Sequence, residues 1–178
     1  RFQTPAEAVE FTRLGWDTMQ KLRDLPFPTT AMVNGFCMGG GLEMALACTY
    51  RVALDDPKTR FAFPEVMLGI MPAWHGVQWL PKLVGPGPAF DLLLTGKALD
   101  AKRAKRIGLV DRVVPDDQLD AAVDAAVHDL LAGGPQAQAH VKQLVRRVAG
   151  QAEDIDAYAA DLIARVRASE EGREGVAA

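Results

Sequence analysis

Residues 29–72 contain the feature that most constrains the fold: a strand pattern, a run of glycines and an apolar helix pattern, in that order. Over residues 29–34, Ala31 and Val33 alternate with neighbours of different character, which is typical of a half-buried strand. Three glycines follow at 39–41, and residues 42–48 are then apolar with Glu43 as the only charge, which is typical of a buried helix. A strand joined to a buried helix by a glycine turn indicates an α/β protein.

The glycine run predicts a site for a negatively charged oxygen. Glycines at the start of a helix leave the free backbone N–H groups unobstructed, and the positive end of the helix dipole adds to their attraction for an anion. Such a site can hold a phosphate or stabilise an oxyanion that forms in a transition state. Glu43 comes three residues after Gly40 and would repel a phosphate, and the chain has no nucleotide-type glycine motif here. The pattern therefore favours an oxyanion site with a carboxylate beside it.

A second carboxylate, Glu65, follows Pro64 and precedes an apolar segment. We expect partial burial to raise its pKa toward the working pH. Two carboxylates that face one oxyanion site could activate a water molecule and deliver a proton to carbon. Each glutamate taken alone has a simpler interpretation, as a charge or cap at a helix N-terminus. The glycines taken alone could serve close packing of a helix against a strand.

The ordered motifs over residues 28–115 resemble the enoyl-CoA hydratase/isomerase, or crotonase, family. The segments that carry this resemblance are 30–35, 39–43, 63–70, 94–96 and 108–115. They are most similar to the hydratase part of bacterial fatty-acid oxidation multifunctional proteins. The resemblance implies an α/β, crotonase-like fold, with a partial core over residues 1–115 and a helical region over residues 116–178. That helical region would cover the pocket and join an oligomer contact.

The resemblance also implies a reaction, the hydration of 2-enoyl-CoA thioesters to 3-hydroxyacyl-CoA in fatty-acid β-oxidation. Gly40 N–H would be one oxyanion-hole donor, Glu43 would deprotonate water, and Glu65 would give a proton to carbon. The CoA thioester is then the substrate, and neither a bound cofactor nor a metal site is expected. The residues expected to bind substrate are Met38, Gly39, Pro64, Leu68, Gly69, Ala73, Trp74 and His75.

The segment 73–76 departs from the family pattern, which has small residues where this chain has Ala73 and His75. Trp79 also stands where an arginine is common. The added bulk would restrict the substrate; the alternatives are drift in a surface turn and a new catalytic histidine.

Two other functions remain open. One is an enoyl-CoA isomerase, for which Glu65 alone suffices. The other is a truncated, non-catalytic domain, because the family's second oxyanion donor and its strand-rich first part would precede Arg1. We therefore expect little hydration by the isolated 178-residue chain.

Composition narrows the partners and the compartment. The chain has a net charge of −3 and a pI near 5.6, which argues against a nucleic-acid partner. It has no apolar window of membrane-spanning length and no signal-peptide pattern at its start. Cys37 and Cys48 lie in apolar contexts and are expected to be buried and reduced, as in a cytoplasmic protein. We expect a homo-oligomer, a trimer or hexamer, that can form part of a larger multifunctional chain.

Periodicity and breakers predict the remaining elements. Strands are expected near 29–34, 51–54, 60–63 and 111–114. Helices are expected near 4–25, 42–48, 76–83, 89–94, 100–107, 116–132, 135–148 and 152–169.

Overall fold

The computed structural model describes residues 5–150 and eight single residues between 158 and 174. The chain divides into two compact units. Unit 1 comprises residues 1–23 and 29–123, and unit 2 comprises residues 24–28 and 124–178. The candidate site lies wholly in unit 1. The functions predicted for residues 116–178, pocket cover and oligomer contact, stay predictions.

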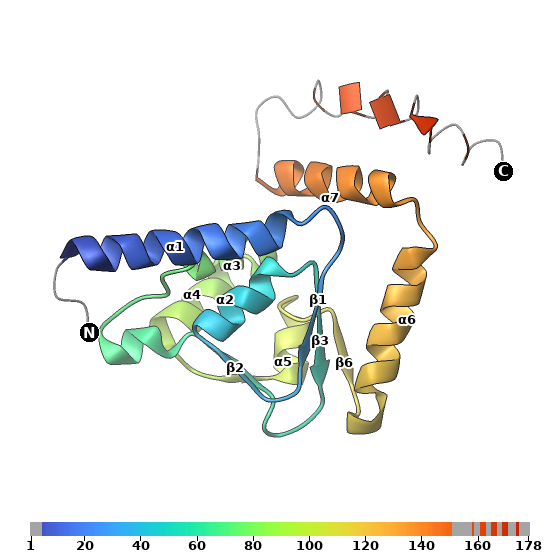
Figure 1. The fold of residues 1–178 in the computed structure, drawn as a ribbon. Helices are drawn as coiled ribbons and strands as arrows, with labels where there is room; N and C mark the ends of the chain where they lie inside the picture. Colours follow the sequence, from blue (N-terminus) through green and yellow to red (C-terminus); the bar gives the residue numbers. More distant parts are fainter. Residues whose placement is uncertain are drawn as a thin grey trace. The chain divides into compact units, whose positions relative to one another are not determined.

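Unit 1 is built on two small sheets (Figure 1). The first has three parallel strands in the order β1 (Thr30–Val33), β3 (Tyr50–Leu54) and β6 (Arg112–Val114). In the second, β4 (Arg60–Ala62) lies between β2 (Phe36–Met38), which is parallel to it, and β5 (Leu99–Asp100), which is antiparallel. The predicted α/β class is therefore confirmed.

The helices follow the predicted order. They are α1 (Pro5–Asp24), α2 (Gly40–Ala47), α3 (Gly76–Val84), α4 (Pro86–Thr95), α5 (Ala101–Arg106), α6 (Leu119–Leu131) and α7 (Pro135–Ala149), with 3₁₀ turns at Pro64–Leu68 and Asp116–Gln118. Asp100 caps α5, because its carboxylate accepts a hydrogen bond of 2.6 Å from the Arg103 N–H. The helix predicted over 152–169 lies for the most part outside the described residues.

Three local details differ from the predicted elements. After the break at Gly35, the chain returns at once to an extended conformation as β2 and joins the second sheet, a change of partner that a period-2 pattern cannot reveal. Helix α2 begins at Gly40, so two of the three glycines are helical. Cys48, its C-cap residue, is only half-buried, whereas Cys37 is buried as predicted; both are free thiols.

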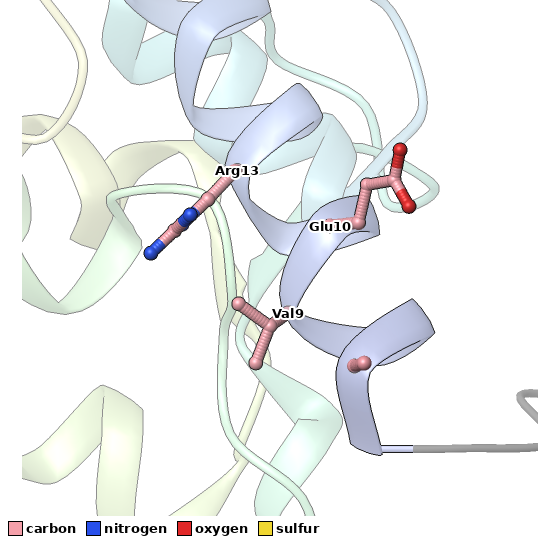
Figure 2. Close-up of a pocket in the computed structure, with 4 residues that line it drawn as sticks. Val9, Glu10 and Arg13 are labelled. Carbon is pink, nitrogen blue, oxygen red and sulfur yellow. The ribbon is translucent and has the colours of Figure 1, made fainter.

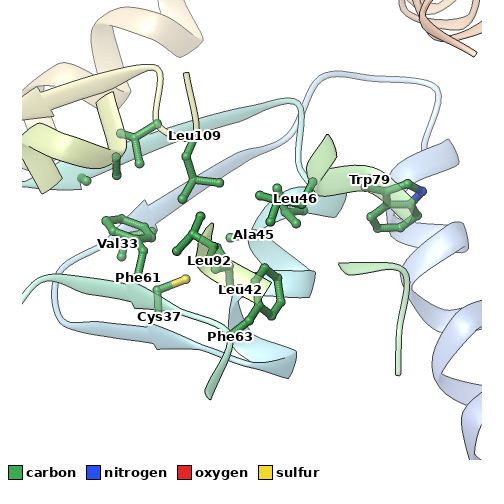
Figure 3. Packing of buried hydrophobic residues seen from close by; sticks show 14 of the residues in the cluster. Val33, Cys37, Leu42, Ala45, Leu46, Phe61, Phe63, Trp79, Leu92 and Leu109 are labelled. Carbon is green, nitrogen blue, oxygen red and sulfur yellow. The ribbon is translucent and has the colours of Figure 1, made fainter. Parts of the chain in front are cut away.

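Helix α2 lies at the centre of the core (Figure 3). Its Leu42 and Leu46 side chains are buried together with Phe61 and Phe63 from the β4 segment. Leu92 of α4 completes this group. Burying large apolar side chains of a short helix stabilises the fold by about 1.5–3 kcal/mol per side chain. The core therefore fixes the position of the glycine turn from which α2 starts.

A buried arginine on β3 links the end of α2 to the segment that precedes β6. Arg51 is 4% exposed, and its guanidinium donates to the carbonyls of Leu109 (2.8 Å) and Cys48 (2.9 Å). It also pairs with Asp111, whose Oδ2 lies 3.0 Å from the guanidinium and accepts a 2.7 Å hydrogen bond from the Arg51 backbone N–H. The sequence patterns did not identify this cluster.

Unit 2 joins α7 to the short segment 24–28. Lys142 donates to the carbonyls of Leu25 (2.8 Å) and Phe27 (2.6 Å). Arg146 lies 3.7 Å from the Asp24 carboxylate. Within the described residues, no helix combines the length and apolar character needed to cross a membrane.

Candidate active site

The glycine turn presents the start of α2 as the sequence predicted. Gly39 precedes the helix with φ 53°, a left-handed value that glycine adopts without strain. Its N–H binds the Ala62 carbonyl at 3.0 Å, and its carbonyl accepts from Leu42 and Glu43. Across the described part of the chain, no hydrogen bond involves the N–H of Gly40, which is in the first turn. This N–H is therefore available to a ligand oxygen.

Glu43 is a buried carboxylate that backbone groups hold in place. It is 2% exposed, and its Oε1 accepts hydrogen bonds from the N–H groups of Trp74 (2.7 Å) and Gly76 (2.8 Å). Burial raises the pKa of Glu43, the two backbone hydrogen bonds oppose this, and the nearby charge of Glu65 raises the pKa further. The second oxygen, Oε2, remains for another partner.

Glu65 approaches the same turn from the opposite segment. It lies in the 3₁₀ turn after β4, and its Oε1 would be 2.6 Å from a Cβ added at Gly39. Its Oε2 is buried and has no hydrogen-bond partner among the described residues. A buried carboxylate oxygen without a donor is costly unless a ligand, a proton or water satisfies it. The two glutamates therefore flank the turn whose next residue carries the free N–H.

The other predicted substrate residues are distributed around this turn. Met38 and Pro64 are half-buried next to it. Leu68 is 75% exposed, and Gly69 ends the 3₁₀ turn with φ 71°. The Ala73 methyl is exposed, so it adds no bulk inside the unit.

Trp74 is the bulky side chain at the site. Its indole lies against Gly40, where Cζ3 would be 2.9 Å from an added Cβ. On the other side, a Cβ added at Gly15 of α1 would overlap the indole. Phe11 packs beside it, with ring centroids 5.4 Å apart. Trp74 thus lies between α1 and the start of α2.

His75 belongs to an aromatic stack instead of pointing at the glutamates. Its ring stacks on Trp79 at 4.5 Å and on Trp16 at 5.3 Å between centroids. The Arg23 guanidinium lies 4.5 Å above the Trp79 ring. Burial lowers the pKa of His75, the Trp16 backbone opposes this, and the Arg23 charge lowers it further. These contacts give His75 a packing role and do not support the alternative of a new catalytic histidine.

Trp16 also ties α1 to the loop that holds Glu43, because its indole N–H donates to the Ala73 carbonyl. The sequence contained one signal for this docking, a glycine at position 15 inside a helical pattern, which usually has a packing reason. An open depression of about 530 Å³ lies elsewhere along α1 (Figure 2). This depression is lined by Ala6, Val9, Glu10 and Arg13, and neither Glu43 nor Glu65 belongs to its lining.

The sequence profile of the enoyl-CoA hydratase/isomerase family matches residues 3–178. The chain belongs to this family. Among curated relatives, it is 51% identical over 116 residues to the fatty acid oxidation complex subunit alpha of Vibrio campbellii, and 52% identical over 117 residues to that of Vibrio cholerae. These matches cover 65% and 66% of this chain and 16% of each relative.

Superposition on solved structures, enoyl-CoA hydratases among them, confirms the predicted crotonase-like fold. DspI of Pseudomonas aeruginosa superposes with a TM-score of 0.90 at 32% identity. The enoyl-CoA hydratase of Mycobacterium smegmatis gives a TM-score of 0.90 at 30% identity. Each superposition covers 99% of this chain, and 67% or 68% of the longer neighbour.

Proposed function

We propose that this crotonase-family chain hydrates 2-enoyl-CoA thioesters to 3-hydroxyacyl-CoA, with Glu43 and Glu65 as the acid–base pair. One observation carries the proposal: both carboxylates flank the Gly39–Gly40 turn, at which the Gly40 N–H is unused among the described residues. A hydratase needs these three elements together. They are a donor for the thioester oxygen, a base for water and an acid for carbon.

The geometry supports a division of labour between the carboxylates. The Gly40 N–H would stabilise the negative charge that develops on the thioester oxygen. Glu43 is held through Oε1 by two backbone N–H groups, so its Oε2 can orient water and accept a proton as the water oxygen bonds to C3. Glu65, whose Oε2 has no partner within the described chain, would then protonate C2. The proton gained by Glu43 returns to Glu65 through solvent before the next turnover.

This chemistry uses only side chains, backbone donors and water, so the proposal involves no bound cofactor or metal. The partners that belong to it are the acyl-CoA substrate and further copies of the chain, as a trimer or hexamer. The curated relatives are subunits of a fatty acid oxidation complex and are several times longer. We therefore propose that this domain can work within a larger multifunctional chain. The cytoplasm, where free thiols such as Cys37 and Cys48 persist, is the compartment we propose.

The test is the loss of enoyl-thioester absorbance with crotonyl-CoA, in the full natural chain. Glu43→Gln and Glu65→Gln should each lower kcat by about 10²–10⁴, the usual contribution of a general acid or base. The double variant should lose little more than either single one, because both groups act in one step. In wild type, kcat/KM should rise with pH through a pKa above the ordinary 4.5 of a glutamate, because burial raises that of Glu43 and the base must be ionised.

A 3-enoyl-CoA isomerase is the second candidate, favoured by the partnerless oxygen of Glu65 at the turn. A proton shuttle needs only this one carboxylate. If isomerisation of a 3-enoyl-CoA survives Glu43→Gln while hydration by wild type is absent, the isomerase replaces the hydratase. Near wild-type hydration by Glu43→Gln would contradict the two-carboxylate mechanism.

A further inference from the structure

The Trp74 indole occupies the space directly beside the proposed oxyanion donor. Its six-membered ring faces Gly40, with Cζ3 and Cε3 at 2.9 and 3.2 Å from an added Cβ. Its five-membered ring faces Gly15, and Phe11 packs at its side. The half-buried ring is packed between two helices, α1 and α2, so its position is fixed by contacts on both sides.

The backbone of Trp74 fixes where this ring lies relative to the reaction. The Trp74 N–H binds Glu43 Oε1 at 2.7 Å, and the Gly76 N–H binds the same oxygen at 2.8 Å. In the proposed hydration, Glu43 directs water to C3 of the acyl chain. Acyl carbons beyond C3 therefore begin next to Glu43 and the loop 73–76 that holds it. Trp74 is the largest side chain of that loop.

Packing alone keeps the indole in this position. The Nε1–H of Trp74 is buried and has no acceptor within the described residues. The room for the ring comes from Gly15 and Gly40, two positions at which a Cβ would collide with it. An apolar wall of this kind excludes a longer chain by volume, since close-packed interiors yield little to added methylene groups.

We propose that Trp74 is a specificity-determining residue that closes the acyl end of the site and restricts it to short-chain thioesters of the crotonyl size. The inference rests on the proposed function, because it takes the acyl direction from the roles of Gly40 and Glu43. It assigns the restriction to position 74, whereas the sequence pattern had directed attention to positions 73 and 75. Ala73 is exposed, and His75 packs in the stack between Trp16 and Trp79.

Two measurements on the full natural chain test this inference. The first compares kcat/KM for crotonyl-CoA and 2-decenoyl-CoA. Wild type should prefer crotonyl-CoA, and Trp74→Ala should shift the ratio toward 2-decenoyl-CoA at least tenfold, the scale on which pocket size discriminates methylene groups. Trp74→Leu, a smaller change that keeps an apolar side chain, should shift it in the same direction but less. Phe90→Ala removes an exposed aromatic ring from α4 and serves as the matched control, which should leave the ratio unchanged.

The second measurement is the calorimetric affinity for butyryl-CoA and decanoyl-CoA, saturated thioesters that cannot react. Wild type should bind butyryl-CoA more tightly than decanoyl-CoA, which carries the same CoA group. Trp74→Leu should reduce or reverse this difference in affinity. This readout separates the two proposals. If wild type hydrates neither enoyl-CoA but shows this Trp74-dependent binding, the hydratase proposal is wrong and the proposal that Trp74 limits the acyl length is supported. If both chain lengths are hydrated and bound alike, with no change in either Trp74 variant, the proposed role of Trp74 is wrong and the hydratase proposal is supported.

Discussion

At the residue scale, the candidate site contains two residues in unfavourable states. One is a buried carboxylate, Glu43, and the other is a residue with a left-handed backbone, His75. Glu43 is a nearly fully buried carboxylate whose pKa is raised by burial, and only two backbone N–H groups offset that cost directly. Its neighbour in the loop, His75, has φ 79°, a left-handed conformation that side chains with a Cβ rarely adopt. Both residues are maintained by the surrounding packing and hydrogen bonds, which over-determine the loop.

The His75 conformation leads to a prediction about stability. His75→Gly would relieve backbone strain of about 1–2 kcal/mol. It would also remove ring contacts with Trp16 and Trp79, each worth about 0.5–1.5 kcal/mol beyond the area they bury. Because two contacts and their buried area outweigh one strained φ, we expect His75→Gly to lower the free energy of unfolding by about 1 kcal/mol in urea denaturation. His75→Asn, which tolerates this φ but does not stack, should be no more stable than the glycine variant.

The same variant should change the pH dependence of stability. The pKa of His75 is lower in the folded chain than its ordinary 6.5, chiefly through burial. The unfolded chain therefore binds more protons as the pH falls below that value, and the stability present above pH 6.5 declines toward the folded pKa. His75→Gly should lose this part of the decline between pH 7.5 and 5.5. An unchanged slope in the variant would show that other groups account for it.

At the element scale, α1 is a docking helix for the loop that holds Glu43. Trp16 of α1 donates to the Ala73 carbonyl, and Gly15 makes room for the Trp74 indole. The bounds of α1 could be predicted from its capping pattern and proline stops, and the structure confirms them within a few residues. The docking of α1 could not be predicted from the sequence. It depends on the contact between Gly15 and Trp74, which are 59 positions apart, and local periodicity does not encode such a contact.

Replacing Gly15 tests this docking. Alanine is normally favoured over glycine in a helix by about 0.8–1 kcal/mol. Here the added methyl would overlap Trp74, so Gly15→Ala should instead destabilise unit 1 by about 1–3 kcal/mol, the usual cost of overpacking. Gly41→Ala is the matched control, since a Cβ at Gly41 in α2 meets nothing within 4 Å.

A double-mutant cycle completes the Gly15 experiment. Combining Gly15→Ala with Trp74→Ala should recover most of the loss due to the methyl group, because the clash partner is gone. Equal melting temperatures for the Gly15→Ala and Gly41→Ala variants would contradict the docking geometry.

At the scale of the whole molecule, the glycine turn and the two glutamates beside it could be predicted more fully than the contacts that support them. The sequence patterns placed Gly40, Glu43 and Glu65 on a strand–turn–helix unit and a proline turn, and the structure brings these residues to one place. The motifs that contain these residues are short stretches of sequence, so their local structure could be predicted without knowing any distant contact. The Arg51–Asp111 pair was not predicted, because its members come from distant segments and each is unremarkable alone.

Arg51 gives the prediction at this scale. Its guanidinium connects the end of α2 with the β6 segment through Cys48, Leu109 and Asp111. Asp111→Asn would leave the buried Arg51 cation without its carboxylate; because Asp111 is partly exposed and Arg51 keeps two carbonyl acceptors, we expect a cost of about 1–3 kcal/mol. Chemical denaturation should show this loss, and Asp55→Asn, which removes an exposed partner of Lys102, should cost less than about 1 kcal/mol. Similar costs for both variants would show that Arg51 does not depend on its partner.

The strand order of the first sheet has a consequence for how the chain assembles over time. Strand β3 pairs with β1 across a short connection, Thr30 with Tyr50, but with β6 across a long one, Val52 with Arg112. Closing the shorter connection costs less chain entropy. Every residue of the candidate site, from Phe11 to Trp79, also precedes β6 and leaves the ribosome before it. A newly synthesised chain can therefore assemble its glycine turn first, and the β6 segment then brings the Leu109 carbonyl and the Asp111 carboxylate to Arg51.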